Sequence, residues 1–414
     1  MSKQQEKFFD FNKFWFKCFG LWVPDEKEKS YKLLIYTYNA IIVSYSVILF
    51  TIAQIISILD INNDRATFIK NINLVSSFCV TNYKVYIWFS RRKEFLRLFE
   101  FVEDSFSIFE EHDDFKPSYI IAKRQRFKDN FLKGYLGLSY FISFFCLLNE
   151  VTQVLLSGEK YFVYSNETVR FDCDVEIPFQ CWLPFDPFQS KIKHFFGVFM
   201  QVVAVILGGS ITVCVDTLYM SAVLGVTIHF ELLQGGFRTI RENCAKKLGI
   251  SGDFIRDPPE LIEMTDNKMK KLVIHLQKVL TFCDLLEDLY TITILSQLLI
   301  SMVALCTCLF LVSEVPMSSE LIPQIFYLLC VENQIALYCY AANELTLSAS
   351  LIPQSLYESN WLSTSNNFKN SIRLTMLRMS EPVYLTIGKF MPLTLSTFVS
   401  IGRISYSLLA VLKR

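Results

Sequence analysis

The sequence predicts an all-α integral membrane protein with seven transmembrane helices, its N-terminus in the cytosol and its C-terminus outside the cell. Three observations support this fold class. Of the 414 residues, 52% are hydrophobic and only 19% are charged, which is too apolar a balance for a soluble fold. Seven stretches reach the about 20 mainly apolar residues that a bilayer-spanning helix needs. The segments between these stretches are alternately rich and poor in Lys and Arg.

Hydropathy along the chain gives approximate limits for the spans. They are Leu33 to Leu59, Phe68 to Phe89, Phe131 to Leu156, Phe195 to Leu224, Leu285 to Val312, Leu321 to Ala342 and Phe390 to Leu412. The chain is thereby divided into a cytosolic amphipathic segment (1–32), a bundle of spans one to six (33–342), a cytosolic anchor segment (343–388) and a seventh span (389–414). The sequence has no internal repeat, which disfavours a transporter built from inverted repeats.

The positions of the basic residues orient the chain. The segments assigned to the cytosol contain 30 Lys and Arg, those assigned to the outside contain 8, and Lys84 and Arg403 lie inside spans. An excess of basic residues in short cytosolic loops is the rule for helical membrane proteins. The total charge is balanced, with 40 basic against 40 acidic residues, so it does not indicate a nucleic-acid partner. The N-terminal region lacks the uninterrupted apolar run of a removable signal peptide.

Helices are also expected outside the bilayer core. Aromatic residues mixed with lysines between Phe8 and Phe19 predict an amphipathic helix that lies on the cytosolic leaflet. The apolar pattern before Leu285 predicts that span five continues as a helix into the cytosol, and spans two, three and four have similar extensions. A cytosolic helix of about Phe368 to Ser380 is expected to break before Pro382, because proline disfavours helical geometry at the preceding residue.

The loop after span three contains two features of an extracellular segment. The sequon Asn166-Glu167-Thr168 predicts glycosylation at Asn166, which requires that the loop lie outside the cell. Cys173 and Cys181 are the only two of twelve cysteines clearly in an outside loop, and an oxidising exterior favours a disulfide between them. The alternative is a pair of unpaired thiols.

Several ionisable residues lie inside the predicted spans. Lys84 is near the inner end of span two and Asp216 is in the middle of span four, where an unpaired charge is costly. One interpretation is an ion pair between them; the other is that Lys84 extends to the lipid headgroups. Glu332 in span six and Glu344 at its inner end are expected to be structural hydrogen-bonding groups rather than ion ligands.

The sequence contains no pattern expected of an enzyme. No His-x-x-x-His or Glu-x-x-His pair is present, and the four histidines are dispersed, so no metal site is predicted. A phosphate loop, a nucleophile elbow and a dinucleotide fingerprint are also absent from the sequence. We therefore expect neither catalysis nor a bound cofactor.

The outer halves of spans two to six are rich in aromatic and apolar side chains, with a few small polar groups nearby. This composition suits an apolar pocket with a few orienting hydrogen-bond donors. For any single one of these residues, contact with lipid or packing within the bundle is the more common explanation. The candidate ligand-binding residues are Leu74, Ser77, Phe78, Phe144, Phe145, Leu148, Phe199, Val203, Val303, Thr307 and Phe326.

The final span carries an unusual number of polar residues, among them Arg403 and Ser405. This polar content is excessive for a helix that faces lipid on all sides. It suits a helix that packs around a symmetry axis and lines a water-filled pathway. Leu408, Leu409 and Leu412 are candidates to close such a pathway as a hydrophobic constriction.

Several stretches resemble a known family, the insect odorant receptors. The run Gly20-Leu21-Trp22-Val23-Pro24 is similar to the family's N-terminal signature, and Lys84 lies where its second helix often has a lysine. The region from about Tyr340 to Lys413 resembles the family's C-terminal block. The similar residues there are Asn343-Glu344-Leu345, Trp361, Gly388-Lys389-Phe390-Met391-Pro392-Leu393, Phe398 and Ser405-Tyr406-Ser407. The family consists of seven-helix ligand-gated cation channels with a topology inverted relative to G-protein-coupled receptors.

The resemblance implies a tetramer in which the last helix of each subunit lines the pore and cytosolic helices form an anchor at the axis. When Ser405-Tyr406 is matched to the family's Thr-Tyr step, Leu409 falls at the hydrophobic gate and Leu412 to Lys413 at the outer pore mouth. The family's universal coreceptor has a Gln near its end and a longer loop after span four, and this chain has neither. The resemblance therefore implies a ligand-tuning subunit that needs the coreceptor to form a working heterotetramer.

The function implied by the resemblance is that of an odorant receptor subunit of a non-selective cation channel. It would bind a small volatile, hydrophobic odorant in the outer half of the bundle and lie, surrounded by lipid, in the plasma membrane of a sensory neuron dendrite. A gustatory-receptor-like channel fits less well, because such receptors tend to keep the terminal Gln. A G-protein-coupled receptor is the other alternative, and it requires an extracellular N-terminus, against the distribution of basic residues.

Overall fold

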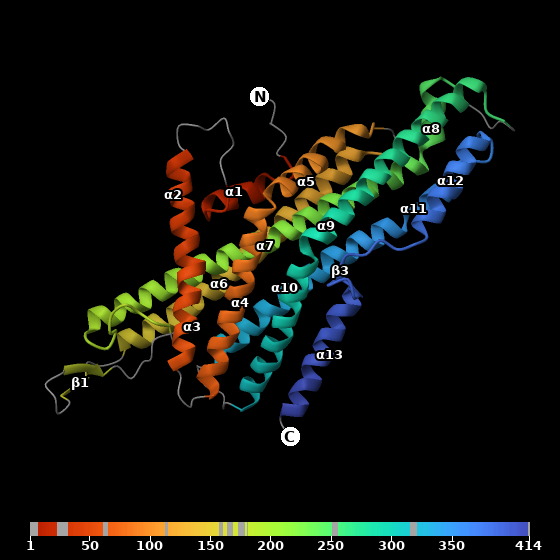
Figure 1. The fold of residues 1–414 in the computed structure, drawn as a ribbon. Coiled ribbons are helices and arrows are strands. Elements are labelled where there is room, and N and C mark those ends of the chain that lie inside the picture. Colours follow the sequence, from red (N-terminus) through yellow and green to blue (C-terminus); the bar gives the residue numbers. More distant parts are fainter. Residues whose placement is uncertain are drawn as a thin grey trace.

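The computed structural model describes residues 7–22, 32–60, 65–111, 115–156, 160–163, 169–172, 179, 181–250, 256–314 and 321–412. Most of these residues are helical (Figure 1). The helices are α1 (Asp10–Cys18), α2 (Lys32–Val43), η2 (Ser44–Leu49), α3 (Phe50–Asp60), α4 (Arg65–Ser90), α5 (Arg92–Asp104), η3 (Ser105–Ile108), α6 (Pro117–Leu156), α7 (Lys191–Arg238), α8 (Ile240–Lys247), α9 (Pro259–Glu314), α10 (Leu321–Ser350), α11 (Ile352–Tyr357), α12 (Asn366–Met379) and α13 (Leu395–Leu412). Two antiparallel strand pairs join β1 (Lys160–Val163) to β2 (Val169–Asp172) and β3 (Thr386–Ile387) to β4 (Met391–Pro392).

Four of the described helical segments are long and apolar enough to cross a membrane. They are Leu34–Ile58, Ile192–Arg238, Pro259–Leu311 and Ile325–Tyr357, and they coincide with predicted spans one, four, five and six. The first is a continuous helix made of α2, the π-helical η2 and α3. Predicted spans two, three and seven also form helices, α4, α6 and α13. The C-terminal ends of α3, α9 and α13 lie at the same end of the bundle, as alternating crossings require (Figure 1).

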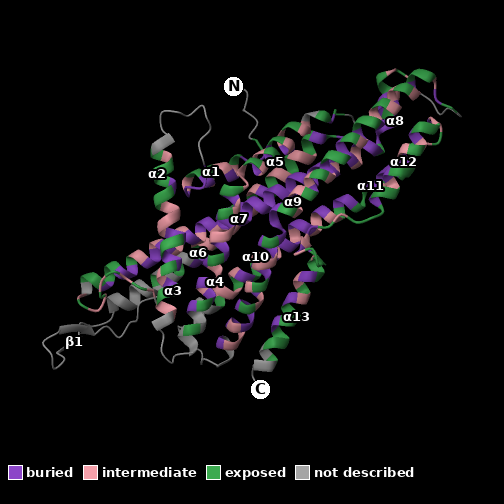
Figure 2. Cartoon of the chain, viewed as in Figure 1, coloured by how far each residue is buried: buried purple, intermediate pink, exposed green. Residues whose placement is uncertain are grey.

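Helix α7 forms the centre of the bundle. Every residue from Val213 to Phe230 is buried, so this part of α7 presents no face to solvent or lipid. The helix packs against α4, α6, α9 and α10. Figure 2 shows the buried residues concentrated along α7 and α9, while α13 is largely exposed. The core therefore depends mainly on α7 and its immediate neighbours.

Helices α7 and α9 are far longer than a membrane span. They contain 48 and 56 residues, which at about 1.5 Å per residue gives lengths of about 72 and 84 Å. The hydrocarbon core of a bilayer is only about 30 Å thick. Both helices therefore extend well beyond the membrane, as predicted for spans four and five.

Helix α1 packs into the protein rather than on a lipid surface. Phe8, Phe9 and Phe16 are buried, and the ring of Phe9 stacks on that of Phe99 in α5 with centroids 4.2 Å apart. The prediction that the aromatic face of this segment lies on the cytosolic leaflet is wrong for these three side chains. The reason is that an amphipathic pattern has the same appearance whether lipid or protein covers its apolar face. Phe14, which is 58% exposed, is not covered by the bundle.

The extensions of α7 and α9 form a separate helical end together with α8, α11 and α12 (Figure 1). Ser365 caps α12, because its hydroxyl accepts a hydrogen bond from the Phe368 amide at 2.9 Å and donates one to Asp266. Arg241 and Asp257 form a buried ion pair at 2.7 Å. Helix α12 ends at Met379, so the break predicted before Pro382 is confirmed.

The seventh span begins later than predicted. It was expected from Phe390, but α13 begins at Leu395, and Phe390 lies in the β3–β4 turn with 84% of its surface exposed. The turn needs a left-handed backbone at Gly388 (φ 57°) and Lys389 (φ 65°). A side chain at Gly388 would also crowd Leu295 of α9 at 2.9 Å. The apolar residues Phe390 to Leu393 predict a helix by composition, whereas the left-handed backbone at Gly388 and Lys389 imposes a turn.

Candidate functional site

Lys84 of α4 and Asp216 of α7 form an ion pair inside the bundle. Lys84 Nζ lies 2.6 Å from Asp216 Oδ1, and neither side chain has any exposed surface. The pairing inferred as one alternative from the sequence is thus confirmed. The other alternative, in which Lys84 extends to the headgroups, is wrong. The geometry follows from the central position of α7, which places Asp216 where only neighbouring helices reach it.

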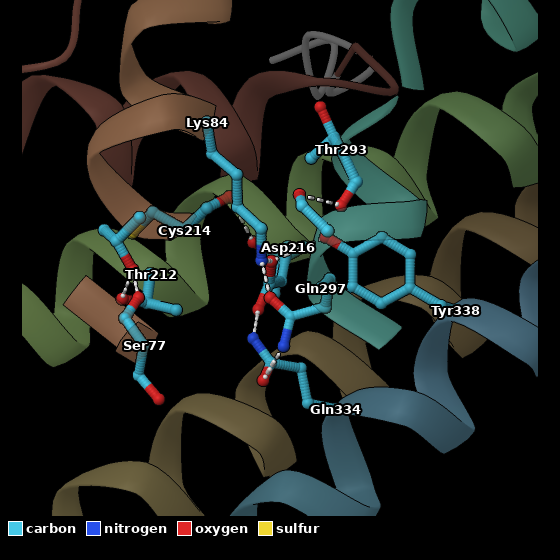
Figure 3. Close-up of polar contacts among 12 residues, drawn as sticks. Ser77, Lys84, Thr212, Cys214, Asp216, Thr293, Gln297, Gln334 and Tyr338 are labelled. Atoms are coloured by element: carbon cyan, nitrogen blue, oxygen red, sulfur yellow. Dashed lines mark hydrogen bonds and ion pairs between the residues drawn. The ribbon is translucent and has the colours of Figure 1, made fainter. Parts of the chain in front are cut away.

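Three further polar side chains complete this buried network (Figure 3). Lys84 Nζ donates to Gln297 Oε1 of α9 at 2.6 Å, and Tyr338 of α10 donates its hydroxyl to Asp216 Oδ1 at 2.7 Å. Gln334 of α10 donates to Asp216 Oδ2 and accepts a hydrogen bond from Gln297 Nε2 at 2.8 Å. Both charges are therefore paired and hydrogen-bonded, the condition under which buried charges are tolerated. The network joins α4, α7, α9 and α10.

A line of polar side chains continues along α4 from Lys84 toward the predicted outer end of the bundle. Asn73, Ser77 and Thr81 follow one another at intervals of four residues, which places them on one face of the helix. The Thr81 hydroxyl lies 2.8 Å from that of Thr212 on α7. From Asn73 to Lys84 this face covers about 16 Å at about 1.5 Å per residue.

Two predicted pocket residues, Ser77 and Thr307, lie near the predicted outer end of this line. Asn73 Nδ2 donates to the Thr307 hydroxyl of α9 at 2.8 Å, and Ser77 Oγ lies 2.8 Å from the Tyr327 hydroxyl of α10. Tyr327 also donates to the Asn73 carbonyl at 3.1 Å. Ser77 and Thr307 are thus brought together through Asn73 and Tyr327. The sequence reasoning missed these two linking residues, although Asn73 precedes Ser77 by one helical turn and Tyr327 follows the predicted Phe326.

The other predicted pocket residues divide into separate groups. Leu74 and Phe78 lie on an adjacent face of α4 and pack with Phe50 and Ala204. Phe145 of α6 contacts Phe326 of α10 edge to face with centroids 5.4 Å apart. Val203 is half-buried, and the remaining four are more exposed, with exposed fractions between 47% and 62%; these are Phe144, Leu148, Phe199 and Val303. The structure therefore brings together part of the predicted set rather than all of it.

A cavity beside charged groups lies elsewhere. A cavity of about 790 Å³ opens between the N-terminal part of α6 and the C-terminal part of α7, and none of the predicted pocket residues lines it. Its lining includes Arg124 and Glu231, which belong to the predicted cytosolic extensions. It lies beyond the predicted inner ends of spans three and four, apart from the candidate ligand site.

The predicted gate residues are only partly described. Ser405 is 1% exposed and lies on the side of α13 that packs on the bundle, where its hydroxyl has no hydrogen-bond partner among the described residues. Leu408 is 43% exposed. The side chains of Leu409 and Leu412, and the whole of Lys413, lie outside the described part of the chain.

Two predictions concern the loop after span three. Asn166 and Cys173 lie outside the described residues, so glycosylation and the Cys173–Cys181 disulfide stay predictions. Cys181 is half-buried, and its Sγ lies 3.0 Å from Gln201 Nε2 on α7. The next residue, Trp182, donates its amide to the Ala53 carbonyl of α3 at 3.0 Å, so this part of the loop packs on the first span.

Two histidines meet in the extensions beyond spans four and five. His229 Nδ1 of α7 lies 3.3 Å from His275 Nε2 of α9, and both side chains are buried beside Phe101. Burial and the adjacent His275 lower the pKa of His229 to about 3. Burial, together with Lys278, lowers the pKa of His275 to about 4. Among the described residues no group of three His, Cys, Asp or Glu side chains is arranged to hold a metal ion.

Together these features define a class of protein: a helical membrane protein that crosses the bilayer several times and has polar groups buried between its spans. The match to known proteins gives the family. Residues 64–406 match the family model described as 7tm Odorant receptor. Because this match covers most of the chain, the protein belongs to the odorant receptor family, a family of receptors and channels rather than enzymes.

Individual relatives agree with this assignment. The chain is 22% identical over 294 residues to Odorant receptor 67c of Drosophila melanogaster, covering 71% of this chain and 69% of the relative. It is 24% identical over 268 residues to Odorant receptor Or1 of Anopheles gambiae, covering 59% and 61% respectively. The solved structure of the olfactory receptor OR5 from Machilis hrabei in complex with eugenol is similar, with a TM-score of 0.74 at 15% identity over 97% of this chain and 96% of that one. The predicted seven-helix fold is confirmed.

Proposed function

We propose that this chain is the odorant-binding subunit of a ligand-gated, non-selective cation channel. A small, uncharged, hydrophobic volatile binds in the outer half of the bundle and favours the open state, in which α13 has moved away from the pore axis. The observation that carries the proposal is the polar line on α4. It runs from Asn73, which is hydrogen-bonded to Thr307, through Ser77 and Thr81 to Lys84 of the buried pair. The eugenol bound in the structurally similar OR5 supports a ligand of this kind.

The ligand site is proposed around the hydroxyl groups of Ser77, Thr307 and Tyr327, with the Phe145–Phe326 contact as part of its apolar wall. A site with few polar groups and no free charge favours an uncharged ligand that accepts one or two hydrogen bonds. Ser77 contacts Tyr327 directly, and Thr307 is linked to them through Asn73, so a ligand that takes over one of these hydrogen bonds changes how α4, α9 and α10 are held together. The shift toward the open state is limited by the difference in ligand affinity between the two states.

The pore is proposed to be lined by α13 at the axis of a tetramer. Thr397, Ile401 and Ser405 form the buried stripe of α13, and most of the rest of its described surface is exposed in the single subunit. The exposed polar residues Arg403 and Ser407 on this surface need another subunit or a water-filled pathway rather than lipid. Ser405 lies on the buried stripe and is left out of the proposed pore face. Leu408, Leu409 and Leu412 are kept as the proposed hydrophobic gate.

The gate proposal gives a direct test. Leu409→Ala removes apolar bulk from the constriction, so we expect a larger basal current or altered block by pore-blocking ions, measured by voltage clamp. The control is Ile404→Ala, an apolar truncation of a 46% exposed residue on the same helix. Equal basal current and equal block in both variants would remove Leu409 from the gate.

The proposed orientation places the N-terminus in the cytosol and the C-terminus outside, in the plasma membrane of a sensory neuron dendrite. The 30 to 8 distribution of Lys and Arg between the two sides supports it. An epitope tag at each end, stained on intact cells, tests this: only the C-terminal tag should be labelled. Labelling of the N-terminal tag alone would indicate the topology of a G-protein-coupled receptor, the alternative that the family membership also disfavours.

The subunit is proposed to work in a heterotetramer with the family's coreceptor. The absence of the coreceptor's terminal Gln and of its longer loop after span four supports this assignment. Expression in oocytes with and without the coreceptor, followed by a broad odorant panel, tests it. We expect odorant-evoked cation current only in the co-expressing cells. Current from the chain alone, or no response to any odorant with the coreceptor present, would contradict the heteromer.

A further inference from the structure

The cavity between α6 and α7 is lined mainly by basic and aromatic side chains. Its charged lining residues are Lys116, Lys123, Arg124, Arg238 and Glu231, so cations outnumber the single anion. The cavity volume of about 790 Å³ is large enough for a polar headgroup rather than a single ion. Where α7 lines the cavity, position 235 must be glycine, because a Cβ there would overlap the Phe115 ring.

The one acidic residue of the lining, Glu231, shares the guanidinium of Arg124 with Glu344. Arg124 donates to both carboxylate oxygens of Glu231, with Nε–Oε1 and Nε–Oε2 distances of 3.0 and 3.2 Å, and also to Glu344 at 2.9 Å. Arg238 pairs with Glu358 at 2.6 Å but is 53% exposed. By contrast, Lys116 and Lys123 form no ion pair with any described residue, and both are exposed. Within the described part of the chain, the cavity therefore presents two ammonium groups without an ion pair beside an arginine held by carboxylates.

The position of the cavity matches the inner surface of the bilayer in the orientation proposed above. Phe127, which is 40% exposed, lies at the rim toward the membrane, and its ring is 6.1 Å from that of Tyr340. Span three is predicted to begin at Phe131, so Lys123 lies about 12 Å further along α6 at about 1.5 Å per residue. The polar layer on each side of the bilayer core is about 5–8 Å thick. Lys123 therefore lies about 4–7 Å beyond the polar layer, and Lys116, two turns earlier at the start of α6, lies about 10 Å beyond Lys123, so a headgroup between them must project well out of the bilayer.

We propose that this cavity binds the headgroup of a phosphoinositide from the cytosolic leaflet, with Lys116 and Lys123 contacting the ring phosphates. Basic pockets between helices on the cytosolic side of membrane proteins suit such multiply charged headgroups. A serine headgroup carries less charge and does not extend as far, so it fits the distance of Lys123 from the membrane less well. The ring of Phe127, 40% exposed, gives the lipid's glycerol region apolar contact.

The site depends on the orientation in the proposed function but not on odorant binding or gating, so its test uses binding rather than current. The purified full-length chain is reconstituted in nanodiscs of phosphatidylcholine, and phosphatidylinositol bisphosphate is titrated by native mass spectrometry or by competition with a fluorescent analogue. The variant is K116Q/K123Q. The matched control is K270Q/K278Q, which removes two exposed lysines of α9 that do not line the cavity.

We expect the affinity for phosphatidylinositol bisphosphate to fall about 25-fold in K116Q/K123Q, since each basic residue near an anionic lipid surface contributes about fivefold. The control variant and the charge-retaining K116R/K123R should bind like the unmodified chain. Equal weakening in K116Q/K123Q and K270Q/K278Q would overturn the site, because it would show only a general effect of charge. Soluble inositol trisphosphate binding as tightly as the lipid would overturn the lipid assignment in favour of a soluble polyphosphate.

Discussion

Removal of one member of the Lys84–Asp216 pair should destabilise the bundle severely. Lys84→Met leaves the Asp216 carboxylate buried with hydrogen bonds from Tyr338 and Gln334 but no cation. Breaking a buried pair in this way costs about 3–5 kcal/mol, because an uncompensated charge is left behind. Lys84→Met should therefore lower the free energy of unfolding by about 3–5 kcal/mol, measured in detergent by SDS-induced unfolding followed through tryptophan fluorescence.

The double variant separates loss of a charge from loss of the pair. In K84M/D216L both charges are replaced by apolar groups, so we expect it to be more stable than either single variant. The control is Glu94→Gln, which breaks the Arg91–Glu94 pair at the start of α5, where both side chains are about 30% exposed. Partly exposed pairs contribute about 0–1 kcal/mol, so this change should be small. A double variant as unstable as the sum of the two single variants would refute the reasoning, as would a Lys84→Met variant no less stable than Glu94→Gln.

Two further predictions concern packing and pH. Gly208→Ala should destabilise the protein by about 1–3 kcal/mol, because its Cβ would overlap the Phe78 ring, whereas Gly209→Ala meets open space and serves as control; equal unfolding free energies would contradict this. The buried His229 and His275 have pKa values below the ordinary 6.5. Below about pH 6.5 the unfolded chain therefore binds protons that the folded chain does not. The free energy of unfolding then falls with pH by about 1.4 kcal/mol per histidine per pH unit. The melting temperature in detergent should fall between pH 7 and pH 5 more in the unmodified chain than in H229Q/H275Q, and equal falls would exclude the histidines as the cause.

Hydropathy and basic-residue counts predicted the seven helices because both properties depend on composition over long windows. The predicted start of the last span is wrong for the same reason. The apolar residues before Leu395 resemble helix by composition, whereas the left-handed backbone at Gly388 and Lys389 sets a turn there. Likewise the aromatic pattern of α1 predicted an apolar face but could not say that α4 and α5 would cover Phe9 and Phe16.

The candidate site shows a similar limit. Lys84 and Asp216 could be considered as partners because charges inside a membrane need compensation. The roles of Gln297 and Gln334 depend on which faces of α9 and α10 turn inward. A helix that is apolar on all sides does not predict its inward face from a single sequence. The same uncertainty explains Ser405, whose polarity suggested a pore face although the structure places it against the bundle.

The most direct test of the account is whether the outer polar cluster controls the odorant response. In cells that co-express the coreceptor, Tyr327→Phe removes the hydroxyl that contacts Ser77 and Asn73, while Tyr86→Phe removes one from a 64% exposed site on α4. A net hydrogen-bond contribution of about 0.5–1.5 kcal/mol corresponds to a change of about twofold to tenfold in the odorant concentration for half-maximal current. We predict a change of that size for Tyr327→Phe and none for Tyr86→Phe, at equal surface expression. Identical dose-response curves for the two variants would contradict the proposed ligand site.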